Sequence, residues 1–137
     1  DAEQFKTRAD MLTSQYEAFQ VFDDMHVNGQ LTLGENIGDL GGLTIAYKAY
    51  QLSLNGQKSP ELDGFTGEQR FFMGWSQVWR RNYRDEELKR RLTTDPHSPS
   101  RYRVIGVLSN MPEFYKAFDI KPGDKMYRPE EERVKIW

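Results

Sequence analysis

The stretch GENIGDLGGLTIAYKAYQLSL, residues 34–54, decides how this chain folds. Its first nine residues hold four glycines and two acids, and the rest is rich in apolar residues. The apolar residues recur at helical spacing, at Ile37, Leu40, Leu43, Tyr47 and Tyr50. This spacing predicts one helix from about Gly34 to Leu54 with a single buried stripe.

Glycines and acids share the first turns of this predicted helix. Gly34, Gly38 and Gly42 lie four residues apart and therefore on one face, which lets another helix come close. That gain must offset a cost of about 0.5–1 kcal/mol for each interior glycine. Glu35 and Asp39 lie beside the glycines, also four apart. Either they are solvent-exposed acids that favour the positive helix start, or one carboxylate binds a cation while the other orients a neighbouring ligand.

The segments on either side of this helix also have helical patterns. Apolar residues at helical spacing predict a long amphipathic helix over residues 3–22. The pair Asn28-Gly29 predicts a turn with short extended segments beside it. Thr66 and Gln69 form a capping-box pattern, which predicts the start of another helix.

The second half of the chain continues in the same way. The helix after Thr66 carries a broad aromatic stripe of Phe71, Phe72, Trp75, Val78 and Trp79, which is either core or the wall of a ligand site. Residues 85–92 predict a helix with acids first and bases last. Residues 102–120 predict two short helices that meet near Met111-Pro112. We therefore predict a mainly α architecture of four to six helices with little or no sheet.

Composition limits the class of protein. The chain has 137 residues, which indicates one domain. A net charge of -2 argues against nucleic acid as a partner. The absence of cysteine excludes disulfides and cysteine-ligated metal sites. No apolar run approaches the roughly 20 residues of a membrane span.

Two further residues are candidates for chemistry. His97 lies between two prolines in DPHSPSRYR, and Arg103 begins an apolar run. A loop histidine is often a surface residue, and an arginine at such a place is often a buried ion-pair partner. Together the two side chains could instead stabilise an oxyanion.

Three segments resemble a known family: LTLGENIGDLGGLTIAYKAYQ, FFMGWSQVWRRNYR and DPHSPSRYRVIGVLSNMPEFYKAFDI. They are similar to the C-terminal end of the neprilysin-type zinc metallopeptidases, which include neprilysin, the endothelin-converting enzymes and bacterial endopeptidase O. The resemblance covers nearly the whole chain in order. It implies that residues 1–137 are a single fragment, the helical C-terminal portion of a gluzincin-type catalytic domain.

The resemblance also implies a role for each candidate residue. Glu35 resembles the third protein ligand of the catalytic zinc, and Asp39 resembles the acid that orients a zinc-bound histidine. His97 resembles the histidine that stabilises the tetrahedral oxyanion. Arg103 resembles the arginine that binds a substrate backbone carbonyl.

Val78 and Trp79 match the pair that, in this family, walls the pocket for the residue after the cleaved bond. The activity implied is hydrolysis of small peptides through a zinc-activated water. Such an enzyme needs an H-E-x-x-H motif for two zinc ligands and the general base, and the sequence has none. We therefore expect the chain alone to be inactive and to work with an upstream part of its own polypeptide that carries this motif.

Two alternatives from another class remain: a stand-alone helical peptide-binding module, or a subunit completed by a separate chain. Exposed core surface on such a piece would favour self-association. Val134 stands where animal members have a cysteine that pairs, which fits a bacterial member. The expected location is the cell envelope or periplasm, with the cytoplasm as the alternative.

Overall fold

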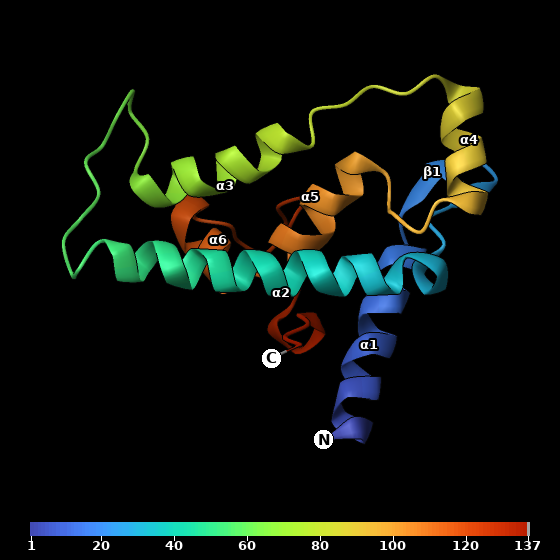
Figure 1. Ribbon diagram of the computed structural model, residues 1–137, viewed down its shortest axis with the longest axis horizontal. Coiled ribbons are helices and arrows are strands. Elements are labelled where there is room, and N and C mark those ends of the chain that lie inside the picture. Colours follow the sequence, from blue (N-terminus) through green and yellow to red (C-terminus); the bar gives the residue numbers. More distant parts are fainter. Residues whose placement is uncertain (137) are drawn as a thin grey trace.

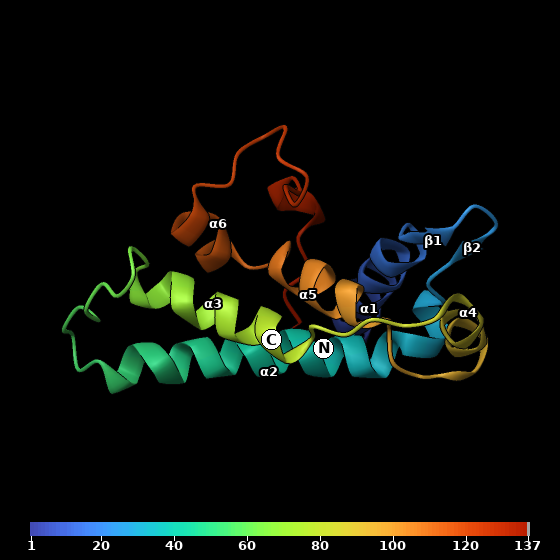
Figure 2. The same ribbon diagram turned by 90° about the horizontal axis from the view of Figure 1, so that it is seen from above.

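A computed structural model describes residues 1–136. The sequence also predicts that the terminal Trp137 packs onto the body of the fold, but this residue lies outside the described ones. Along the chain the elements are α1 (Ala2–Glu17), β1 (Gln20–Phe22), β2 (Met25–His26), α2 (Gly29–Ser53), α3 (Gly67–Val78), α4 (Asp85–Thr94), α5 (Ser100–Leu108), α6 (Pro112–Phe118) and the 3-10 helix η1 (Glu130–Glu132). Helix α2 runs along the length of the molecule (Figure 1), and α1, α5 and α6 lie to one side of it in the view of Figure 2. The prediction of a mainly α fold is confirmed.

Helix α2 begins five residues earlier than the pattern predicts. Asn28 caps it, because its side chain accepts a hydrogen bond from the amide of Leu31 at 2.9 Å. The Asn28-Gly29 pair is therefore a helix start, and the prediction of a turn there is wrong. At Gly29 a Cβ would overlap the carbonyl of Thr13 in α1, so the glycine permits close packing of the two helices.

The early start changes the setting of the two acids. Glu35 and Asp39 lie in the interior of α2, beyond its first turn. The benefit of the positive helix end fades within that turn. Their interpretation as acids of the helix start is therefore wrong, and their placement needs another explanation.

The N-terminal helix is shorter than predicted. Helix α1 ends at Glu17, and the chain then forms the antiparallel pair of β1 and β2, in which Phe22 faces Met25. Two residues of α1, Leu12 and Tyr16, are buried in the core. Phe5 is 40% exposed and lies outside that core.

The capping box and the helix break are confirmed. The Thr66 side chain accepts from the amide of Gln69, and the Gln69 side chain accepts from the amide of Thr66. Pro112 begins α6 after the break that follows α5. Phe72 of α3 is buried and stacks on Tyr47 of α2, with ring centroids 5.3 Å apart. The aromatic stripe of α3 thus contributes to the core.

Helix α2 has one covered and one open face. The buried residues recur at helical spacing and include Thr32, Asn36, Asp39, Leu40 and Leu43. On the other side, a Cβ placed at Gly34, Gly38 or Gly42 would meet no described atom within 4 Å. Ile45 and Leu52 are also exposed, at 66% and 68%. The described part of the chain therefore leaves the glycine face uncovered.

Within residues 1–136, no helix combines the length and apolar character that crossing a membrane requires.

Candidate functional site

Four of the predicted site residues meet at the N-terminal half of α2. Both oxygens of Asp39 accept hydrogen bonds from Arg103 of α5, one from Nε and one from Nη2, each at 2.6 Å. The Asp39 side chain is 9% exposed and that of Arg103 is 12% exposed. Glu35 lies one turn earlier with its side chain 45% exposed, and its Oε2 is 3.8 Å from Arg103 Nη2. Asp39 is therefore buried and paired with Arg103, whereas Glu35 remains accessible to solvent.

The loop between α4 and α5 places His97 beside Glu35. Asp95 Oδ1 accepts from the amide of His97 at 2.9 Å and lies 2.7 Å from its Nδ1. On the other side of the ring, Nε2 is 3.2 Å from Glu35 Oε2. Both ring nitrogens thus face carboxylates, and a neutral imidazole can donate to only one of them.

Buried hydrogen bonds fix this loop on α2. Asn36 is 1% exposed, and its Oδ1 accepts from Ser98 Oγ at 2.8 Å. The Asn36 amide nitrogen donates in turn to Thr32 Oγ1 at 3.0 Å. Because Asn36 follows Glu35 and Ser98 follows His97, this buried contact sets the Glu35–His97 distance.

Asp95 links His97 to α4. Its Oδ2 accepts from Arg91 Nη1 at 2.7 Å, and Arg91 Nε donates to Glu87 at 2.8 Å. Burial alone would raise the pKa of Asp95, but the hydrogen bonds from His97 and the charge of Arg91 outweigh it and hold that pKa below its usual value. The carboxylate therefore stays ionised and keeps an acceptor at His97 Nδ1.

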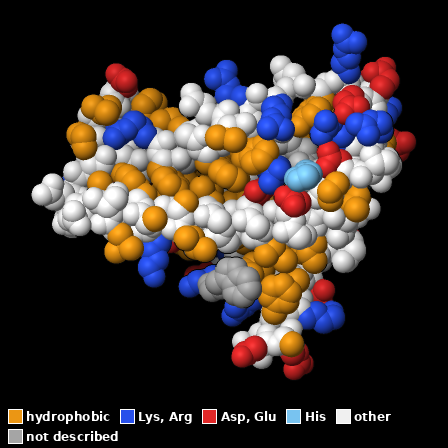
Figure 3. Space-filling model, in the orientation of Figure 1, with side chains coloured by type: hydrophobic (Ala, Val, Ile, Leu, Met, Phe, Trp, Pro, Cys, Tyr) orange, Lys and Arg blue, Asp and Glu red, His pale blue; other side chains and the backbone are white. Residues whose placement is uncertain are grey.

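A cavity of about 190 Å³ lies beside these residues. Its lining includes Trp79, His97 and Arg103. The Arg103 guanidinium lies over the Trp79 ring, 4.0 Å from its centroid, as in a cation–π contact. Val78 is 61% exposed and is not part of this lining, so the structure brings only Trp79 of the predicted pair to the cavity. Figure 3 shows a histidine surrounded by acidic and basic side chains. Hydrophobic side chains are exposed beside them, over α2 and α3.

Tyr16 of α1 lies beneath the ion pair. It is fully buried, and its hydroxyl has no hydrogen-bond partner among the described residues. Burial first, and then the negative charge of Asp39, raise the pKa of this phenol, so it stays neutral. A Cβ at Gly106 of α5 would overlap the Tyr16 ring, so this glycine lets α5 pack directly on α1.

Sequence reasoning missed several residues of this site: Asn36, Arg91, Asp95 and Ser98. The Asp95 contact had a local signal, because an aspartate two residues before an amide commonly closes an Asx turn. The Asn36–Ser98 contact joins residues 62 positions apart, and no local pattern indicates it.

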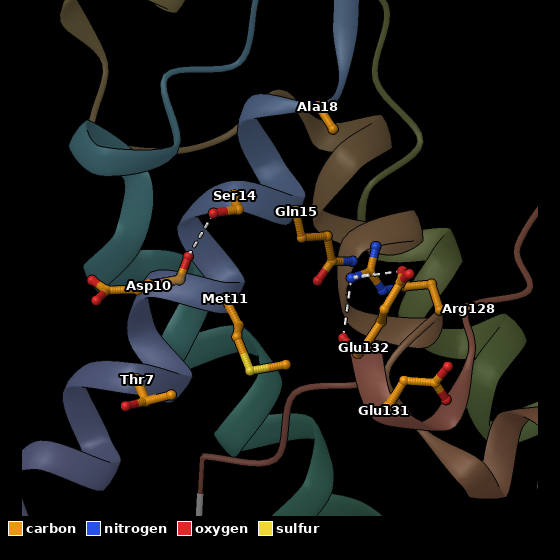
Figure 4. Close-up of a pocket in the computed structure, with 9 residues that line it drawn as sticks. All are labelled: Thr7, Asp10, Met11, Ser14, Gln15, Ala18, Arg128, Glu131 and Glu132. Carbon is orange, nitrogen blue, oxygen red and sulfur yellow. Dashed lines mark hydrogen bonds and ion pairs between the residues drawn. The ribbon is translucent and has the colours of Figure 1, made fainter.

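A second cavity, of about 590 Å³, lies between α1 and η1, far from these residues in the chain (Figure 4). Its polar lining is mostly engaged locally: Ser14 donates to the carbonyl of Asp10 at 2.9 Å, and Arg128 donates to the carbonyl of Glu132 at 3.0 Å. It brings together none of the predicted site residues, so we place the candidate site at the cavity beside His97.

The described residues do not form a complete metal site. Within residues 1–136, no group of three or more histidine, cysteine, aspartate or glutamate side chains could hold a metal ion. Catalytic zinc takes three protein ligands and a water. Glu35 can supply one carboxylate, so any zinc held here would need ligands from beyond these residues.

Comparisons with known proteins identify the family of the chain. The model of peptidase family M13 matches residues 1–134. Endothelin-converting enzyme 1 of Homo sapiens is 45% identical over 139 residues, which cover 98% of this chain and 18% of that protein. Neprilysin-3 of Drosophila melanogaster is 40% identical over 140 residues, covering 98% of this chain and 17% of that protein.

A solved structure has the same fold. It is the Mycobacterium tuberculosis zinc metalloprotease ZMP1 in complex with an inhibitor, with a TM-score of 0.96 and 49% identity. The match covers all of this chain, 100%, and 22% of that one. The chain thus spans about a fifth of the length of these relatives. Because the family model matches nearly the whole chain, the chain belongs to peptidase family M13.

Proposed function

We propose that this chain supplies one side of the active site of a zinc metalloendopeptidase that hydrolyses small peptides. The observation that carries the proposal is that Glu35 lies against His97 and Arg103, two residues that line the cavity, in a chain of this family. These are the residue types that a peptidase needs to bind a metal, stabilise an oxyanion and hold a substrate carbonyl.

Glu35 is the residue of this chain that would hold the metal. Its carboxylate is accessible and borders the open glycine face of α2. Bound zinc would supply a Lewis acid and an activated water. The remaining ligands would come from a part of the protein outside these 137 residues, and an H-E-x-x-H motif is the set that the family resemblance implies.

The open face of α2 suits such a partner. Gly34, Gly38 and Gly42 leave room for a closely packed helix, and exposed Ile45 and Leu52 extend the apolar surface along α2. We propose that the upstream part of the same polypeptide packs here. Without that part, the same apolar surface would favour self-association of the chain.

His97 would stabilise the oxyanion of the tetrahedral intermediate. Asp95 holds a proton at Nδ1 and orients the ring. Nε2 points at an acceptor position that Glu35 Oε2 holds at 3.2 Å. When Glu35 binds the metal instead, an N–H at Nε2 would donate to a substrate oxyanion at the position that Glu35 leaves.

Arg103 would hold a peptide carbonyl. Its Nε and Nη2 are fixed by Asp39, whereas Nη1 has no partner among residues 1–136. The pair with Asp39 and the Trp79 ring hold the guanidinium plane still, so Nη1 can donate in a fixed direction. Asp39 acts on the substrate through Arg103, and its expected contact with a zinc-bound histidine is part of the same proposal.

A second candidate function is peptide binding without catalysis. The cavity, Arg103 and His97 are assembled in this chain, whereas the described residues hold no complete metal site. A stand-alone binding module or a subunit completed by another chain would have this combination. We expect a bacterial protein of the cell envelope or periplasm, with the cytoplasm as the alternative location.

The test compares this chain with a protein extended upstream to include an H-E-x-x-H motif. Zinc content and cleavage of a short apolar peptide are measured in both. We expect the extended protein to bind one zinc and cleave, and the 137-residue chain to do neither. Stoichiometric zinc and cleavage by the short chain, or an inert extended protein, would contradict the proposal.

Metal ligation by Glu35 is tested in the extended protein. Glu35→Ala should remove the zinc, while Glu86→Ala, which changes an exposed glutamate of α4, should leave it in place. Full zinc occupancy in Glu35→Ala would show that another residue is the ligand.

A further inference from the structure

The cavity beside His97 has an excess of positive charge. Three guanidinium groups line it, those of Arg81, Arg91 and Arg103, and its only lining carboxylate among the described residues is Asp95. Two of the three cations are already paired: Arg91 with Asp95 at 2.7 Å, and Arg103 with Asp39 at 2.6 Å. Arg81 has no ion pair with any residue from 1 to 136.

The Trp79 ring contacts this unpaired cation. The Arg81 guanidinium lies 5.3 Å from the centroid of the Trp79 ring, which also contacts the Arg103 guanidinium at 4.0 Å. Two like charges against one ring raise the local positive potential. An anion that entered the cavity would lower that potential and could accept hydrogen bonds from the unpaired guanidinium of Arg81.

The size of the cavity restricts the anion. A volume of about 190 Å³ is that of about six water molecules in the liquid. A carboxylate on a short side chain, such as that of Asp or Glu, fits such a space. The cavity also contains His97 and Arg103, so a group bound there belongs to a peptide held at the proposed active site.

We propose that Arg81 selects peptides with an acidic side chain next to the cleaved bond. This inference rests on the proposed peptidase function, because it assigns the acidic group to a substrate. Arg81 is exposed, so the contribution is that of a partly solvated ion pair. Such an ion pair corresponds to about a fivefold preference in kcat/KM for the acidic peptide, which is about 1 kcal/mol.

The test uses the longer protein and two peptide pairs, which differ only by Glu or Gln at the position directly before or directly after the cleaved bond. We expect about a fivefold higher kcat/KM for the Glu peptide of one pair, decreasing as salt is added. In Arg81→Glu the preference should invert toward a Lys peptide. Arg80→Glu is the matched control, because Arg80 is the exposed neighbour that does not line the cavity.

Binding separates this inference from the proposed function. The affinities of the same peptides for the zinc-free protein are measured by calorimetry. A protein that cleaves nothing but binds the Glu peptide more tightly, through Arg81 alone, would overturn the peptidase proposal and leave Arg81 as a binding site for acidic peptides. Equal affinities and equal kcat/KM values within both pairs would overturn the role of Arg81. An equal effect of Arg80→Glu would do the same, since it would trace the preference to net charge.

Discussion

Replacing Asp39 by alanine should destabilise the chain far more than an ordinary ion-pair deletion does. Arg103 would keep its charge in a site where its side chain is 12% exposed, without either of its two 2.6 Å hydrogen bonds. Removing one partner of a buried pair typically costs 3–5 kcal/mol. Glu35 is 3.8 Å away and compensates in part. We therefore expect a loss of about 3 kcal/mol in the free energy of unfolding.

The chain contains a matched control for this change. Lys6 and Asp10 are also 2.6 Å apart, but their side chains are 75% and 62% exposed. Asp10→Ala should cost at most about 0.5 kcal/mol. The two pairs have the same contact distance, so the difference between the two losses measures burial together with the second hydrogen bond of Arg103.

The assay is urea unfolding of the 137-residue chain, followed by helical circular dichroism and extrapolated to water. In an Arg103→Met background the loss on Asp39→Ala should fall by about 2 kcal/mol, because no buried charge is left unpaired. In a Glu35→Gln background the loss should grow, since the compensating carboxylate is gone. Equal losses for Asp39→Ala and Asp10→Ala would refute the reasoning.

Three further predictions concern the surroundings of this pair. Tyr16→Phe removes a buried hydroxyl without a described partner and should raise the free energy of unfolding by about 1 kcal/mol. The Tyr102 hydroxyl, in contrast, donates to the carbonyl of Gln20 at 2.7 Å, so Tyr102→Phe should lower the free energy of unfolding by about 1 kcal/mol. Urea unfolding of both variants measures the sign of each change. The pKa of Asp95 is lowered in the folded chain, so its contribution to stability is present above about pH 4 and is lost as the pH falls through the folded pKa. Asp95→Asn should therefore flatten the acid limb of a stability–pH curve, and an unchanged limb would contradict this. Gly38→Ala should stabilise the 137-residue chain by about 0.5–1 kcal/mol, because its Cβ meets open space, yet it should reduce zinc content in the extended protein if a helix packs on this face.

Local signals predicted much of the fold. The capping box at Thr66 and the break at Pro112 depend on residues close in sequence, and both are confirmed. The predicted start of α2 is wrong because Asn28 suits two roles. Asparagine followed by glycine forms turns, and asparagine also caps helices, and only the close packing of Gly29 on α1 decides between them.

The sequence predicted four members of the candidate site, but it gave neither the residues that support them nor the contacts between them. Glu35, Asp39, His97 and Arg103 were identified from motifs, whereas the Asp39–Arg103 pair joins residues 64 positions apart. Helical periodicity places each residue on a face but does not say which loop covers that face. The pairing therefore required the packing of α5 on α2.

The interior position of Glu35 and Asp39 separates their roles. Successive residues four apart on a helix point nearly the same way, yet Glu35 is 45% exposed and Asp39 is 9% exposed. The difference arises because Arg103 covers Asp39 and leaves Glu35 at the edge of the open face. A carboxylate has about four lone-pair sites, and Arg103 uses one on each oxygen of Asp39. Asp39 can therefore accept one more hydrogen bond without releasing Arg103. Its expected contact with a zinc-bound histidine and its observed contact with Arg103 are thus compatible, and one buried acid would couple the metal ligands to the arginine that holds the substrate.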